Sequence, residues 1–112
     1  MSFTTWVKSH FSHRGKGLSL YRSGMAKANR GDYEGAIADY SAAICAPHIP
    51  TDVKAMALYN RALAYSAMHE DEKSAEDLTA VLEMPGLPKN IKTEAQERRE
   101  RIRRRNENTD SP

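Results

Sequence analysis

The chain repeats itself with a period of 38 residues, and this feature constrains the fold more than any other in its 112 residues. Between segments 46–62 and 84–100, identical or similar residues recur in a single register. The matched pairs are Pro47–Pro85, Ile49–Leu87, Pro50–Pro88, Val53–Ile91, Lys54–Lys92, Ala57–Ala95 and Arg61–Arg99. The same step takes Tyr59 back to Tyr21. A fixed period of this length predicts structural units that stack on one another.

Within each period, apolar residues recur at steps of three and four, which is helical spacing. Gly31 and Asp32 interrupt the first pattern, and we expect Asp32 to cap the helix that follows. Prolines after the second and fourth helical segments end those helices. We therefore expect an all-α fold of repeated helix–turn–helix pairs, with helices at 17–30, 33–46, 55–68, 72–84 and 89–105. Small residues are expected where paired helices approach closely: Gly24, Ala36, Ala43, Ala62 and Ala75.

These units resemble the tetratricopeptide repeat (TPR), whose pattern is W-x₂-L-G-x₂-Y followed by Ala, Phe and Pro at set distances. The resemblance covers about residues 17–105, and "LYRSGMAKANRGDYEGAIADYSAAI" (20–44) is its most specific part; "LYNRALAY" (58–65) opens the next unit. The chain departs from the family in its period of 38 against about 34. It also departs where Leu20 and Leu58 replace Trp, Lys27 replaces Tyr, and His69 stands in the place of Gly31.

The resemblance implies a short TPR-like α-solenoid, with two repeats and a C-terminal capping helix. We expect a basic N-terminal segment that aligns with the end of an earlier repeat, two repeats, the cap and a disordered tail, at 1–16, 17–50, 51–88, 89–105 and 106–112. Trp6, Val7 and Phe11 would then cover the open end of the array. Because about three units are normally needed for stability, a homodimer that joins the incomplete ends is an alternative.

In this family the first helices of successive units line a concave groove that binds segments of partner proteins. The resemblance therefore implies a protein or peptide partner, bound by Tyr21, Arg22, Met25, Asn29, Tyr59, Asn60, Leu63, Ser66, Arg98 and Arg101. These residues lie opposite the apolar stripe, so we expect their side chains to be exposed. Some members clamp the acidic C-termini of heat-shock chaperones. Asn60 and Arg98 match that clamp, but Glu94 stands where its last Lys should be, which disfavours a chaperone partner.

The acidic residues of the chain do not form a catalytic or metal-binding pattern. Glu34 is expected on a solvated helix face, as are Glu72, Glu76 and Asp77 in the next unit, and Asp39 lies just off the buried edge. His10 and His13 are spaced like metal ligands but lack a second pair of ligands. Cys45 is the single cysteine, which favours a reducing compartment such as the cytoplasm. We therefore expect a non-enzyme without metal or cofactor.

Charge is unevenly distributed along the chain. Residues 1–31 hold six Lys and Arg with no acid, and residues 98–105 hold six arginines with one glutamate. Such an arginine strip is typical of phosphate binding, but Glu94, Glu97 and Glu100 are placed to pair with arginines three and four residues later. Nucleic acid is therefore a disfavoured alternative to a solvated cap. No apolar run approaches the roughly 20 residues that span a bilayer, so a membrane is not expected.

Overall fold

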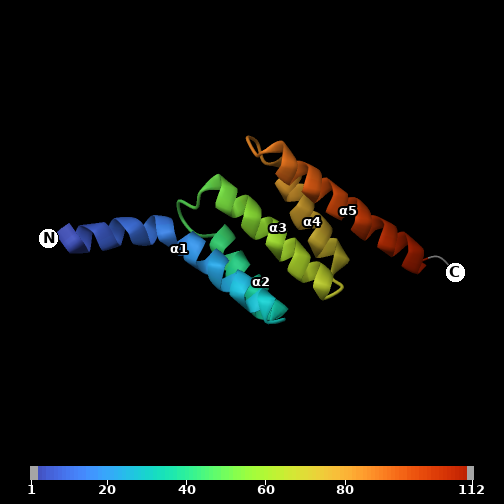
Figure 1. The fold of residues 1–112 in the computed structure, drawn as a ribbon, viewed down its shortest axis with the longest axis horizontal. Helices are drawn as coiled ribbons and strands as arrows, with labels where there is room; N and C mark the ends of the chain where they lie inside the picture. The colour runs from blue at the N-terminus through green and yellow to red at the C-terminus, as the bar shows by residue number, and fades with distance from the viewer. Residues whose placement is uncertain (1–2, 111–112) are drawn as a thin grey trace.

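The computed structural model describes the backbone of residues 3–110 and the side chains of residues 15–108. This part of the chain contains five helices and no strand: α1 (Phe3–Asn29), α2 (Tyr33–Ile44), α3 (Thr51–Ala67), α4 (Asp71–Glu83) and α5 (Lys89–Asp110). Each helix packs against the next in chain order, and α1 also contacts α3 (Figure 1). The all-α prediction is confirmed, and the helices follow one another as an extended array.

Two helices are longer than the sequence pattern predicts. The first continues without a break from Phe3, so no linker separates the basic segment from residues 17–29, and it extends beyond the other helices (Figure 1). The last runs to Asp110, where we expected a disordered tail from 106 onward. Its extension is supported by an ion pair from Arg103 to Glu107, four residues later. The covering role expected of Trp6, Val7 and Phe11 lies outside the described side chains.

The period of the sequence recurs in the contacts between helices. Arg61 of α3 donates to the hydroxyl of Ser41 on α2, at 3.0 Å. One period later, Arg99 of α5 donates to the hydroxyl of Thr79 on α4, at 3.3 Å. Helix α5 therefore meets α4 as α3 meets α2, and the 38-residue period corresponds to a structural unit.

The turns inside the two helical pairs are also equivalent. Gly31 has a φ of 82°, and His69, one period later, has a φ of 60°. Both residues adopt the left-handed conformation that commonly ends a helix and that glycine favours. The alignment of His69 with Gly31 is thus confirmed in the backbone. Asp32 caps α2 as predicted, since its carboxylate accepts a hydrogen bond of 3.0 Å from the backbone N–H of Gly35.

Small side chains let the helices of the array approach closely. Helix α3 lies against several neighbours, and its alanines 55, 57, 62 and 64 are all buried. Ala36 and Ala43 are buried as predicted, whereas Ala75 is only half-buried. The residue one period after Ala36 is Ser74, and it is fully buried. Its hydroxyl donates a hydrogen bond of 2.7 Å to the backbone carbonyl of Ala62. Tyr40, Leu78 and Val81 are the largest apolar side chains that are completely buried.

The expectation that Asp77 lies on a solvated face is wrong. Asp77 is 5% exposed. Arg61 donates two hydrogen bonds to its carboxylate, of 2.8 and 2.7 Å. One period earlier, Asp39 accepts a hydrogen bond of 2.6 Å from Ser23 and forms an ion pair of 3.0 Å with Lys27. The bond from Ser23 is the main cause that lowers the pKa of Asp39, and Lys27 adds to it. Both acids therefore hold helical pairs together.

Two glycines of α1 are expected to respond in opposite ways to replacement by alanine. A Cβ atom at Gly24 would lie 2.6 Å from the buried ring of Tyr40, so Gly24→Ala should lower the free energy of unfolding by about 1–3 kcal/mol. At Gly15 a Cβ atom would meet nothing within 4 Å. Gly15→Ala should therefore raise the free energy of unfolding by about 0.5–1 kcal/mol. Urea unfolding followed by circular dichroism measures both. A stabilising Gly24→Ala would contradict the close packing of α1 on α2.

Candidate functional site

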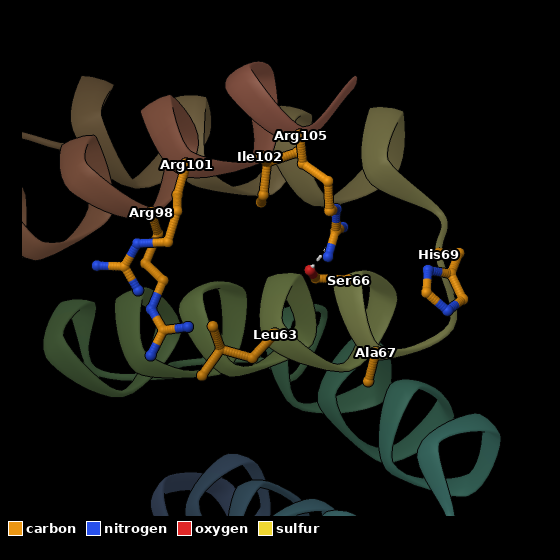
Figure 2. A pocket seen from close by; sticks show the side chains of 8 residues that line it. All are labelled: Leu63, Ser66, Ala67, His69, Arg98, Arg101, Ile102 and Arg105. Carbon is orange, nitrogen blue, oxygen red and sulfur yellow. Dashed lines mark hydrogen bonds between the residues drawn. The ribbon is translucent and has the colours of Figure 1, made fainter. Parts of the chain in front are cut away.

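A groove of about 480 Å³ lies between α3 and α5, the first helices of successive units (Figure 2). It is lined by Leu63, Ser66, Ala67, His69, Arg98, Arg101, Ile102 and Arg105. Its volume lies within the range of about 300–1,000 Å³ that is usual for binding pockets, so it has room for a short segment rather than a folded domain.

Helical spacing brings these side chains to one place. On α5, Arg98, Arg101 and Arg105 follow one another at steps of three and four, so they share one face. Ile102 belongs to the same face and is only 7% exposed, because it packs into the core cluster. On α3, Leu63 also packs against that cluster. The groove therefore has an apolar floor with guanidinium groups along one wall.

The charge of the groove is of one sign. Among the described residues that line it are three arginines and a histidine, and none is acidic. Arg105 forms an ion pair with Asp71 of α4 and donates to the hydroxyl of Ser66 at 3.2 Å. Within the described part of the chain, neither Arg98 nor Arg101 forms an ion pair with a carboxylate. Figure 2 shows both of these side chains extending from α5 toward α3.

Tyr59 was expected to face outward, but the structure places it in the core at 8% exposure. Its hydroxyl is the one buried side-chain polar atom without a hydrogen-bond partner among the described residues. Burial is the main cause that raises the pKa of Tyr59, while Arg98 lowers that pKa and Glu94 raises it. Both α5 side chains therefore lie within reach of the phenol, so the hydroxyl has a donor and an acceptor of this chain beside it. A buried hydroxyl without a partner typically costs about 1–3 kcal/mol.

Tyr21 was also expected to be exposed, and it is half-buried between helices. Its ring lies 6.0 Å from that of Tyr40, centroid to centroid. Its hydroxyl accepts a hydrogen bond of 3.2 Å from the side-chain amide of Asn60, which also donates to the carbonyl of Met56 at 2.8 Å. Tyr21 and Asn60 thus connect α1 to α3, and these contacts hold the two helices together.

The structure brings together only part of the set implied by the family resemblance. Leu63, Ser66, Arg98 and Arg101 line the groove. The α1 residues of that set do not line it: Arg22 and Asn29 are exposed and Met25 is half-buried. Sequence reasoning missed Ala67, His69, Ile102 and Arg105 as lining residues. Ile102 and Arg105 lie one helical turn beyond the predicted arginines, so extending the predicted face by a turn would have found them.

Potential metal ligands are found in other parts of the described chain. No group of three or more His, Cys, Asp and Glu side chains in it has the arrangement of a metal site. Cys45 is exposed. Comparison of the chain with protein-family models, with curated proteins and with solved structures gave no match. None of the described helices has the length and apolar content that crossing a membrane requires.

Proposed function

We propose that the protein is a non-catalytic, TPR-like interaction module that binds a segment of a partner protein in the groove between α3 and α5. The observation that carries this proposal is the groove itself, which lies between the first helices of successive units and is lined by Leu63, Ser66, Arg98 and Arg101. Its apolar floor would receive side chains of the segment, and its wall of arginines would select among segments. The single cysteine favours a reducing compartment such as the cytoplasm for this work.

The proposal is tested by selecting peptides from a random library displayed on phage and measuring their affinity by fluorescence anisotropy. Leu63→Glu places a charge on the apolar floor and should weaken binding by about tenfold or more, because an apolar contact is replaced by a buried carboxylate. The matched control is Ala38→Glu on the exposed face of α2, which should bind like the original protein. Peptides that bind both variants equally would place their site elsewhere and contradict the proposal.

A further inference from the structure

The side chain of Arg105 crosses the groove between α3 and α5. Its guanidinium donates a hydrogen bond of 3.2 Å to the hydroxyl of Ser66 on α3 and forms an ion pair with Asp71 at the start of α4. Figure 2 shows Leu63 on one side of this crossing and His69 on the other. We name Arg105, Ser66 and Asp71 the strap, because their contact separates the His69 end of the groove from the rest.

The strap is not part of the packing that repeats along the chain. The residues one period before those of the strap are Ala28, Tyr33 and Ala67. An alanine side chain has no polar atom, so the equivalent contact between α1 and α3 cannot form. By contrast, the hydrogen bonds that Arg61 and Arg99 donate to hydroxyls of the preceding helix recur at the period. Because α1 and α3 pack without a strap, the strap is an addition to the packing of the repeat.

The strap is exposed, so a ligand can displace it. The Arg105 side chain is 44% exposed, and water can replace the hydrogen bond that it donates to Ser66. Exposed ion pairs add little net stability, so the pair with Asp71 does not fix the guanidinium in one place. By contrast, Ile102 on the same helix belongs to the core cluster. The groove is therefore short while the strap is closed and longer once the guanidinium leaves Ser66.

We propose that Arg105 sets the length of the partner segment that the groove accepts. With the strap closed, a short segment binds with an apolar side chain over Leu63 and Ile102 and ends before Ser66. A segment that continues toward His69 must first break the hydrogen bond of the strap, which lowers its apparent affinity. This inference rests on the proposed function and adds Arg105 as the residue that determines specificity for short segments.

Two selections from one random peptide library test this inference, one against the original protein and one against Arg105→Ala. Peptides selected on Arg105→Ala should bind the original protein about tenfold more weakly than they bind the variant, because the strap blocks part of their path. Mapped by amide chemical shifts on the variant, they should change His69 as well as Leu63. Peptides selected on the original protein should leave its His69 unchanged. Equal affinities and equal maps for the two sets would overturn the inference.

Ser66→Ala is the finer variant, because it removes only the hydroxyl and leaves the ion pair of Arg105 with Asp71 in place. It should bind the peptides selected on Arg105→Ala about three- to tenfold more tightly than the original protein does. The matched control is Arg103→Ala, which removes an exposed arginine of the same helix that does not line the groove. This control should bind them like the original protein. No gain of affinity in Ser66→Ala would overturn the role of the strap.

The outcomes separate the inference from the proposed function. If Leu63→Glu abolishes binding of both sets of peptides but neither set reaches His69 in Arg105→Ala, the groove is a binding site and the length inference is overturned. Arg105 would then only hold α5 to α3 and α4, so its replacement would lower stability without changing which amides respond. If neither selection yields a binding peptide, both proposals fail.

Discussion

Leu78→Ala should lower the free energy of unfolding by about 2–5 kcal/mol, the range found when a buried leucine is truncated in a packed core. Leu78 is completely buried and belongs to the core cluster that joins α3, α4 and α5. The free-energy cost includes the hydrophobic burial that is lost and the cavity that is left behind. The cavity persists because the surrounding helices relax only partly. Urea unfolding followed by circular dichroism measures the change.

The matched control is Leu82→Ala, the same chemical change one turn later on α4. Leu82 is only half-buried, so we expect it to cost clearly less than Leu78→Ala. Equal losses for the two variants would contradict the placement of Leu78 at the centre of the core. An effect of Leu78→Ala below about 1 kcal/mol would contradict the packing of α4 between its neighbours.

Asp77→Ala is expected to lower the free energy of unfolding by about 2–3 kcal/mol, because it leaves the guanidinium of Arg61 without its carboxylate. The pair is held by two hydrogen bonds, and the Asp77 side chain is 7% exposed. The effect is below that of a fully buried pair because 21% of the Arg61 side chain is exposed. Arg61 also lies over the ring of Tyr65, with its guanidinium carbon 5.7 Å from the ring centroid. In Asp77→Ala the guanidinium would therefore keep this cation–π contact but lose its carboxylate partner.

Glu76→Ala, at the neighbouring exposed position of α4, is the control and should change stability by less than about 0.5 kcal/mol. A double-mutant cycle with Arg61→Ala isolates the pair. We expect the two losses to be strongly non-additive, because either change alone removes the same interaction. Additive losses would show that the two residues do not stabilise the fold as a pair.

The repeat could be predicted from the sequence because stacked units must present equivalent residues at equivalent places. Its period predicted the equivalent turns at Gly31 and His69 and the succession of helices. The pattern could not predict the length of α1 or α5. No proline interrupts the N-terminal segment or α5, and charged residues in α5 pair along the helix, so neither segment contains a proline that would stop a helix. The relation to the TPR family stays a prediction.

The side chains of α3 are buried on more than the one face that the sequence predicts. We expected one buried stripe, with Tyr59 on the opposite face. An inner helix of an array contacts neighbours on several sides, so more than one of its faces is buried. The many alanines of α3 indicate this crowding, because only small side chains allow such close approach. Counting alanines as well as large apolar residues would have placed Tyr59 near a helix interface.

The arginines of α5 illustrate what sequence spacing can decide. Pairing with glutamates three and four residues away was expected along the helix, and Arg103 does pair with Glu100 and Glu107. The same spacing allowed Arg98 to pair with Glu94 and Arg101 with Glu97, yet neither ion pair forms. Arg98 and Arg101 instead line the groove. Their orientation depends on where α3 lies, and local sequence spacing does not contain that information.

The most direct test of the groove is to map amide chemical shifts while isotope-labelled protein is titrated with a peptide selected from the phage library. We expect the largest changes at Leu63, Ser66, Arg98, Arg101 and Ile102, on the facing sides of α3 and α5. Small changes are expected on the outer face of α4, around Glu76, which has its own shallow acidic surface. Changes concentrated on that face of α4, or on α1 alone, would contradict binding between α3 and α5.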